Sequence, residues 1–296
     1  MSARKVASEA VVQLGLAGAR LRLLLDGYNT TYRVDQAGER YALRVTRSGP
    51  SLAHVQAEVA WMRALASDTG LRLATPLGVV EVRSRVCVLT SWVVGTTRAA
   101  SLMPRHQHAV GVAMAQLHQH ALGWSAPPGW ERPRLDEVWL DEPSPLPQLA
   151  GEAHDVFAEA AERIRPLLTQ LVADQAIALH GDLHQYNVKQ HPRLGPGLLD
   201  FDDCAVGHPA QDVAIAAYYL SGHRREAALL GAFEAGYRTV RPWPVDTGRM
   251  AALRAWRVLG LCASVHAHPS EDLRARIPEF LPRWEARLRG WLEAAN

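Results

Sequence analysis

A short stretch from residue 179 to residue 204 concentrates side chains that bind cations or move protons. Its sequence is LHGDLHQYNVKQHPRLGPGLLDFDDC, and the set comprises His180, Asp182, His184, Asn187, Asp200, Asp202 and Asp203. The span from residue 187 to residue 201 fits a strand, a turn rich in Gly and Pro, and a returning strand. Such a hairpin would bring Asn187 and Asp200 back to one side of a cleft. Any fold for this chain therefore has to place a dense set of oxygen ligands at one edge.

The first third of the chain predicts a small antiparallel sheet with one long helix. After a helix-like opening, residues 21–48 alternate apolar and polar residues, with turn signals at Asp26-Gly27 and Ala37-Gly38. Residues 51–67 have helical spacing of their apolar positions. Two more strands are expected around residues 81–85, the second of them ending at Gly95.

The remainder of the chain predicts mainly helices. Helical patterns run from Arg98 to about Ala121, from about Glu152 to Ala173, and through most of the chain after Pro209. Residues 124–149 contain six prolines and three tryptophans, a proline density that predicts an irregular connection. We interpret the tryptophans there mainly as packing residues. The sequence thus predicts an α+β fold, with a sheet-rich lobe over residues 1–95 and a helical lobe over residues 96–296.

Composition excludes several classes of protein. The formal net charge is +2, from 32 basic and 30 acidic residues, so nucleic acid is not expected as a partner because its binders concentrate positive charge. The three cysteines are far apart and lack metal-ligand spacing, which predicts reduced thiols and a cytoplasmic location. No apolar run reaches the length of a membrane span, and neither a membrane span nor a signal peptide is expected.

The spacing of three residues indicates phosphoryl transfer. Asn187 follows Asp182 by five positions and Asp200 follows it by eighteen, the separations of a kinase catalytic loop and its metal-binding aspartate. Phosphoryl transfer needs an aligned acceptor hydroxyl and neutralisation of the developing charge, mostly by Mg²⁺. We predict that Asp182 accepts the hydroxyl proton and that Asn187 and Asp200 bind the metal.

With these residues the sequence resembles the aminoglycoside phosphotransferase and homoserine kinase-like superfamily. The resemblance rests on HGDLHQYN and LLDFDDCAVGHPAQD and extends from about residue 21 to about residue 220. It implies a two-lobed protein-kinase-like fold that binds ATP and Mg²⁺. In that arrangement His180 supports the catalytic loop and Asp212 braces it from a following helix. Apart from the resemblance, Asp202 is a further candidate metal ligand beside Asn187 and Asp200.

Upstream residues are candidates for the nucleotide site through the same resemblance. The segment LLDGYNTTYRV, with Gly27 and Asn29, resembles the loop that covers the phosphates. Arg44 stands where the family has a phosphate-binding Lys, and Glu58 on the next helix is its expected partner. The connector VLTSWVVG resembles the segment that hydrogen-bonds adenine.

Three residues of the connector region and the catalytic lobe are then expected to contact the adenine base. These are Ser91 and Val93, through the backbone, and Lys189, whose aliphatic stem would cover the ring. Since Arg44 and Lys189 both depart from the family pattern, a pseudokinase that binds nucleotide without turnover is one alternative.

Two further alternatives come from the same residues. His180, Asp182 and His184 alternate as on one face of a strand, and with Asp200 and His208 they could form the transition-metal site of a hydrolase. A Ser/Thr protein kinase of the same superfamily is the other alternative.

The acceptor is expected to be a small molecule with a hydroxyl group, such as homoserine, an amino alcohol, a sugar or an aminoglycoside. After Asp212 the chain has twelve Arg and eight Asp plus Glu. A polycationic aminoglycoside favours carboxylates, so this composition favours a neutral or carboxylate-bearing acceptor.

Overall fold

The structure, a computed structural model, describes residues 2–47, 49–140 and 142–295. The chain divides into two compact units that are each discontinuous in sequence. Unit 1 comprises residues 1–98, 124–132 and 186–202, and unit 2 comprises residues 99–123, 133–185 and 203–296. The expected division into two continuous lobes at residue 95 stays a prediction. Unit 1 also contains residues 96–98 and two later segments, 124–132 and 186–202. The predicted α+β class is confirmed.

Unit 1 contains a five-stranded antiparallel sheet in the order β1-β2-β3-β6-β5. Its strands are β1 (Arg20–Asp26), β2 (Thr30–Gln36), β3 (Glu39–Val45), β5 (Pro76–Val82) and β6 (Arg85–Ser91). β2 and β3 meet in a two-residue turn in which both Ala37 and Gly38 have positive φ, at 50° and 85°. That geometry matches the right-handed twist of paired strands, and it confirms the turn predicted at these residues.

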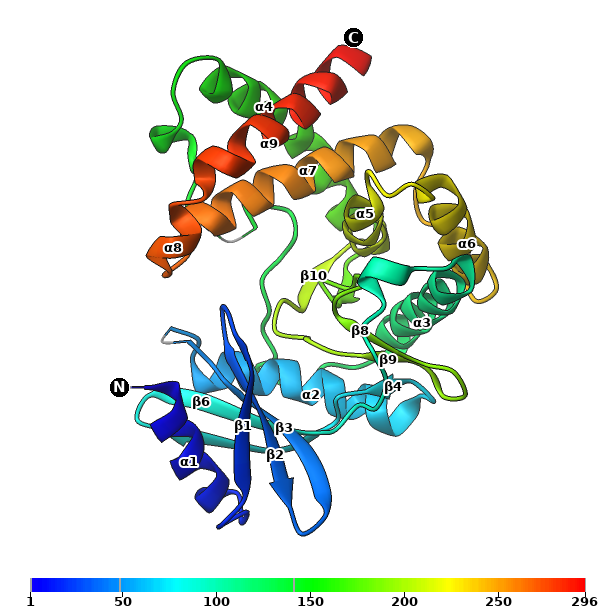
Figure 1. Ribbon diagram of the computed structural model, residues 1–296. Coiled ribbons are helices and arrows are strands. Elements are labelled where there is room, and N and C mark those ends of the chain that lie inside the picture. The colour runs from blue at the N-terminus through cyan, green and yellow to red at the C-terminus, as the bar shows by residue number, and fades with distance from the viewer. Residues whose placement is uncertain (1, 48, 141, 296) are drawn as a thin grey trace. The chain divides into compact units, whose positions relative to one another are not determined.

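Two helices cover the two faces of this sheet, as Figure 1 shows. They are α1 (Ala3–Gln13) and α2 (Leu52–Asp68), which pack against alternate side chains of β6 on opposite faces. Cys87 and Leu89 pack in one cluster with α1, whereas Val86 and Val88 pack in another with Val55 and Val59 of α2. Because successive strand residues point to opposite faces, β6 is apolar on both sides.

A second sheet in unit 1 has three short strands in the order β4-β9-β8. The pairing of β8 (Val188–His191) with β9 (Gly195–Leu198) confirms the predicted strand, turn and returning strand. Beyond the last pair, the Leu199 amide donates to the Asn187 carbonyl at 3.0 Å. The hairpin therefore returns the chain to Asn187 just before Asp200. The short strand β4 (Arg72–Leu73), parallel to β9, was not expected from the sequence.

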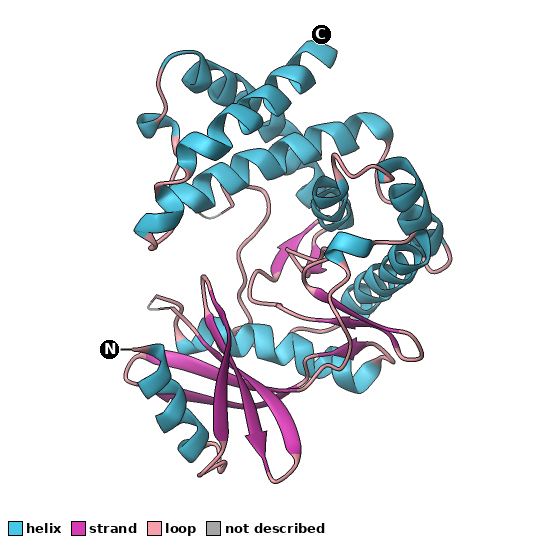
Figure 2. Ribbon diagram, in the orientation of Figure 1, coloured by secondary structure: helices cyan, strands magenta, loops and turns pink. Residues whose placement is uncertain are grey.

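Unit 2 is mainly helical, and Figure 2 shows its helices in cyan. They are α3 (Pro104–Gly123), α4 (Gly151–Asp174), α5 (Pro209–Leu220), α6 (Glu226–Arg238), α7 (Thr247–His266), α8 (Glu271–Arg274) and α9 (Ile277–Ala294), with two 3₁₀ turns, η1 (Ala99–Ser101) and η2 (Leu146–Gln148). α3 and α6 approach closely because each has a glycine at the contact. A Cβ at Gly111 would lie 2.0 Å from the Phe233 carbonyl oxygen, and one at Gly236 would lie 2.0 Å from that of His108.

Two expected boundaries differ from the structure. β6 ends at Ser91 rather than at Gly95, and α3 begins at Pro104 rather than near Arg98. Gly95 has a φ of 131°, outside the strand region, and a Cβ there would lie 2.8 Å from the Gln190 carbonyl oxygen. Pro104 starts the helix because proline suits the first helical position and disfavours helical geometry in the residue before it.

The connection that was expected to be irregular contains bends, turns and one 3₁₀ turn. In its unit 1 part, the Trp124 and Trp130 rings meet edge to face at 5.2 Å, and Trp130 Nε1 donates to the Ala57 carbonyl at 2.8 Å. These contacts confirm the packing role expected for the two tryptophans.

The three cysteines, Cys87, Cys204 and Cys262, are buried, and none of them forms a disulfide. Burial raises the pKa of Cys87 and of Cys262 to about 12, so both remain protonated. In the part of the chain that the structure describes, no helix combines the length and apolar character needed to cross a membrane.

Candidate active site

The loop that follows β7 (Ile177–Leu179) in unit 2 is fixed by a buried carboxylate. Asp212, near the start of α5, accepts hydrogen bonds from the backbone amides of His180 at 2.9 Å and Gly181 at 2.8 Å. His118 Nε2 lies 3.1 Å from the same carboxylate. Asp212 is fully buried, and these three contacts satisfy its oxygens. The predicted contact by which Asp212 braces this loop is therefore confirmed.

The charge of Asp212 follows from the same contacts. Burial alone would raise the pKa of Asp212, but the hydrogen bond and charge of His118, with the Gly181 amide, bring it below its ordinary value. Gly181 is required beside it, because its φ is 82° and a Cβ there would lie 2.0 Å from the Asp203 carbonyl oxygen. The backbone before Asp182 is thus set by residues far apart in the sequence.

The Asp182 side chain contacts Arg257 and His184, both in unit 2. Arg257, on α7, donates through Nη2 to Asp182 Oδ1, and His184 Nε2 lies 3.1 Å from Oδ2. Burial alone would raise the pKa of Asp182, but the Arg257 charge and the His184 hydrogen bond hold it below its ordinary value. Asp182 is consequently a carboxylate at neutral pH, the form that a proton acceptor needs.

Tyr219, at the end of α5, holds the groups around Asp182 in place. Its hydroxyl accepts from Arg257 Nη2 at 3.1 Å, its ring centroid lies 3.8 Å from that of His184, and its carbonyl accepts from Gln185 Nε2 at 2.8 Å. Sequence reasoning missed Arg257, Tyr219 and His118. The one signal for Arg257 is that a charged residue interrupts an otherwise apolar face of the helix over residues 250–263.

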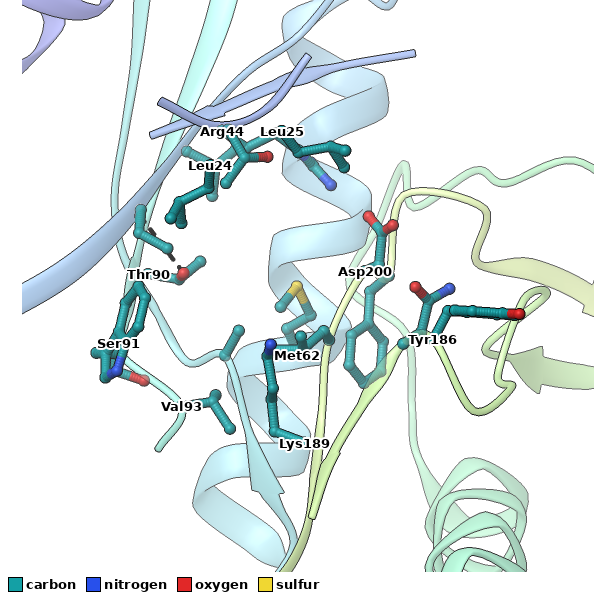
Figure 3. A pocket seen from close by; sticks show the side chains of 18 of the residues that line it. Leu24, Leu25, Arg44, Met62, Thr90, Ser91, Val93, Tyr186, Lys189 and Asp200 are labelled. Atoms are coloured by element: carbon teal, nitrogen blue, oxygen red, sulfur yellow. Dashed lines mark hydrogen bonds between the residues drawn. The ribbon is translucent and has the colours of Figure 1, made fainter. Parts of the chain in front are cut away.

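Unit 1 contains a cavity of about 580 Å³ that brings together most of the predicted nucleotide residues. Its lining includes Arg44, Glu58, Ser91, Val93, Asn187, Lys189 and Asp200, along with apolar residues such as Leu24, Met62, Val88 and Phe201. Figure 3 shows Leu24, Thr90 and Ser91 on one side of the cavity, Tyr186 and Asp200 opposite them, and Val93 with Lys189 at one end. A mostly apolar cavity with a few charged groups is typical of a small-molecule site.

The predicted pairing of Arg44 with Glu58 is present. Arg44 Nη2 lies 2.6 Å from Glu58 Oε2, and the two side chains are 13% and 2% exposed. Burial alone would lower the pKa of Arg44, but the charges of Glu58, Asp202 and Asp200 raise it. Arg44 is therefore a permanent cation in the cavity wall, held by a carboxylate that is more deeply buried.

Asn187 and Asp200 both line this cavity, so the hairpin brings two predicted metal ligands to one site. Asp200 has a φ of 64°, in the left-handed region that non-glycine residues seldom adopt. Amide and carboxylate oxygens are ligands that suit Mg²⁺, and together with the Arg44 cation they fit a metal-bound polyphosphate.

Asp202, Asn29 and Gly27 do not line the cavity as described. Asn29 Nδ2 donates to Asp202 Oδ2 at 2.5 Å, and Asn29 Oδ1 accepts from the Arg47 amide at 3.0 Å. The two side chains therefore connect the β1–β2 turn to the segment after Asp200. Their roles in nucleotide and metal binding stay predictions.

The connector after β6 has some of its hydrogen-bonding groups already used. The Ser91 amide donates to the Thr75 carbonyl at 2.9 Å, and Ser91 Oγ accepts from the Thr75 amide at 3.0 Å. Because these bonds engage the Ser91 amide, it cannot donate a hydrogen bond to adenine, whereas the Val93 backbone remains a candidate for that contact. Lys189 Nζ donates to Thr97 Oγ1 at 3.1 Å, so its head group is held while the residue lines the cavity.

The metal-hydrolase alternative lacks a site. Within residues 2–47, 49–140 and 142–295, no three His, Cys, Asp or Glu side chains gather as a metal site would require. His208 caps α5 instead, with Nδ1 accepting from the Ala210 amide at 3.1 Å.

Comparison with known proteins identifies the family. The model of the phosphotransferase enzyme family matches residues 20–253. The chain belongs to this family. An uncharacterized protein of Deinococcus radiodurans is 31% identical over 306 residues, which cover 92% of this chain and 87% of that protein. The N-acetylmuramate/N-acetylglucosamine kinase of Caulobacter vibrioides is 30% identical over 161 residues, which cover 44% of this chain and 42% of the kinase.

Solved structures of similar fold include two kinases of small molecules. A microcompartment-associated aminopropanol kinase superposes with a TM-score of 0.82 at 22% identity, covering 98% of each chain. Spectinomycin phosphotransferase, in complex with ADP and spectinomycin, superposes with a TM-score of 0.65 at 13% identity, covering 97% of this chain and 94% of the other. The family match makes this chain a phosphotransferase, and the solved structures share its fold.

Proposed function

We propose that this phosphotransferase uses ATP and Mg²⁺ and transfers the γ-phosphoryl group to the hydroxyl of a small molecule. The observation that carries the proposal is the cavity of unit 1, in which apolar walls accompany Arg44, Asn187 and Asp200. An apolar slot suits a purine, and a cation with two oxygen ligands suits a metal-bound triphosphate.

Asn187 and the charged residues of the cavity each have a proposed task. Arg44 binds the phosphates, with Glu58 fixing its guanidinium at 2.6 Å. Asn187 and Asp200 hold Mg²⁺, which when bound would neutralise charge on the phosphates. The stem of Lys189 lies against the base, and the backbone at Val93 hydrogen-bonds its edge. Asp202 steadies Asn29 beneath the phosphate-covering turn.

Asp182 is proposed as the group that receives the proton of the acceptor hydroxyl. Its carboxylate is ionised at neutral pH, because the Arg257 charge and the His184 hydrogen bond overcome the effect of burial on its pKa. The brace from Asp212 fixes the loop backbone on which Asp182 stands. Positioning and proton acceptance of this kind are the main protein contributions to phosphoryl transfer.

Three of the similar proteins are an aminopropanol kinase, an N-acetylmuramate/N-acetylglucosamine kinase and a spectinomycin phosphotransferase. We therefore propose an acceptor of similar size with an alcohol group. A Ser/Thr peptide acceptor is an alternative outcome of the same experiment.

The test is turnover of purified protein with ATP and MgCl₂ against amino alcohols, sugars, hydroxy acids, aminoglycosides and Ser/Thr peptides. ADP release should depend on one class of acceptor, and ³¹P NMR should show a phosphate monoester. Asp200→Asn is the matched variant, because Asn tolerates the left-handed backbone at this position while removing the charge. Absence of ADP release with every acceptor, along with no thermal stabilisation by MgATP, would contradict the proposal.

A further inference from the structure

Arg257 has hydrogen-bonding capacity beside Asp182 that the proposed proton transfer does not use. Its side chain is 8% exposed, and Nη2 makes both of its hydrogen bonds, one to Asp182 and one to the Tyr219 hydroxyl. Nε is buried and has no partner within the described chain. A guanidinium carries five N–H donors, so donors on Nε and Nη1 remain for another acceptor.

A buried donor without a partner is unfavourable, and its presence beside a catalytic group indicates that a ligand supplies the partner. The missing partner must be an oxygen acceptor, since guanidinium groups only donate. A charged oxygen fits better than a neutral one, because hydrogen bonds between a guanidinium and a carboxylate are the stronger kind.

Two further arginines of unit 2 lie in this region, and the carboxylates of Asp182 and Asp203 also act on Arg257. Arg254 lies one turn before Arg257 on α7 and pairs with Glu226 at 2.6 Å. Arg287 lies over the Tyr218 ring, with its guanidinium carbon 4.8 Å from the ring centroid. Glu226 is therefore already neutralised by Arg254, and it also accepts from the Gly222 amide at 2.8 Å. An acceptor whose charge is an ammonium would instead meet the Arg257 cation next to Asp182.

We propose that Arg257 binds a carboxylate of the acceptor, so that the substrate is an alcohol that also carries a carboxylate group. This inference rests on the proposed function and narrows its acceptor class. Arg257 thus has two tasks: it keeps Asp182 ionised, and it places the acceptor by its anionic end so that the hydroxyl lies at Asp182. It is a specificity-determining residue, and the proton still passes to Asp182.

The experiment compares alcohols that share one carbon chain and differ in their second group. Each chain is supplied as the carboxylate, the primary amide and the amine, for example 4-hydroxybutyrate, 4-hydroxybutyramide and 4-aminobutanol, with the homoserine and glycerate series alongside. The measured quantity is kcat/KM with ATP and MgCl₂ for each member. In the wild type we expect the carboxylate member of the best series to exceed its amide by at least tenfold.

Two variants isolate Arg257. In Arg257→Gln the carboxylate-to-amide ratio should fall at least tenfold, mainly through KM, whatever happens to the rate on the amide. Arg254→Gln is the matched control: it removes one positive charge one turn away on the same helix without touching Asp182, and its ratio should equal that of the wild type. Arg257→Lys keeps the charge and serves if the Gln variant does not fold; it should retain part of the preference.

The outcomes separate this inference from the proposed function. Turnover that is equal or better with amide or amine members overturns the inference and leaves the kinase assignment in place. A carboxylate preference that survives in Arg257→Gln, or that falls equally in Arg254→Gln, also overturns it. Stabilisation by MgATP without turnover of any carboxylate-bearing alcohol counts against it as well. A wild-type protein that neither binds MgATP nor turns over any acceptor would instead contradict the proposed function.

Discussion

Each unit of the molecule contains a buried pair of an arginine and a carboxylate, but the two pairs leave opposite partners accessible. In unit 1, Glu58 is 2% exposed and Arg44 is 13% exposed. In unit 2, Arg257 is 8% exposed and Asp182 is 17% exposed. The first pair offers a cation to its surroundings and the second offers a carboxylate. Phosphate binding needs the former and proton acceptance needs the latter, so the more buried partner in each pair acts as the support.

The largest effect should come from removing the accessible carboxylate of the second pair. Asp182→Asn keeps the shape of the side chain and removes its ability to accept a proton. We expect kcat to fall by roughly 10²–10⁴-fold, the usual contribution of general base catalysis. Steady-state kinetics with the acceptor found by screening measures this. His154→Gln, an exposed substitution on α4, is a control that should leave kcat unchanged. If Asp182→Asn kept the wild-type kcat, Asp182 would not be the group that accepts the proton.

Breaking the support of the first pair should have the next largest effect. Glu58→Gln leaves the buried Arg44 without its counter-charge, and removal of one partner of a buried pair costs about 3–5 kcal/mol. Urea unfolding would show this loss, and MgATP affinity should fall in the same variant.

A surface pair supplies the control for that measurement. Glu9 and Arg83 are 39% and 57% exposed and lie 2.7 Å apart. Glu9→Gln should change the free energy of unfolding by no more than about 1 kcal/mol, because exposed pairs contribute little. Equal losses in the two variants would mean that the burial of Glu58 does not decide the strength of its pair.

A smaller effect concerns pH and the second pair. The pKa of Asp182 is held below its ordinary value by Arg257 and His184 against the opposing effect of burial. Turnover is lost as the pH falls through this pKa, because protonation removes the base. In Arg257→Gln burial is no longer opposed by the arginine, so the pKa rises and the acid limb of the kcat/KM profile should move to higher pH. An unmoved limb would show that Arg257 does not set the ionisation of Asp182.

The two pairs also differ in how far the sequence predicts them. Arg44 and Glu58 are fourteen residues apart on a strand and the following helix, and local periodicity together with a family pattern was enough to pair them. The β8–β9 hairpin could likewise be predicted, because its Gly and Pro residues define the turn between Asn187 and Asp200. Local rules of turn and strand formation account for both.

Arg257 and Asp182 are 75 residues apart, and their contact depends on how α7 packs with α5. No local pattern specifies that packing, so sequence reasoning assigned Asp182 a role without finding its partner. The same applies to His118, which reaches Asp212 across 94 residues. The sequence also could not show that the Ser91 amide donates to the Thr75 carbonyl, because that bond depends on the irregular pairing at the start of β5.

The most direct test of the account is calorimetric titration of a non-hydrolysable ATP analogue with Mg²⁺ into wild type, Asp182→Asn and Asp200→Asn. In the proposed mechanism, nucleotide and metal bind in the unit 1 cavity and Asp182 accepts the proton. We therefore expect wild-type affinity in Asp182→Asn and at least a tenfold loss, about 1.4 kcal/mol, in Asp200→Asn. Equal losses in both variants, or unchanged binding in Asp200→Asn, would contradict this mechanism.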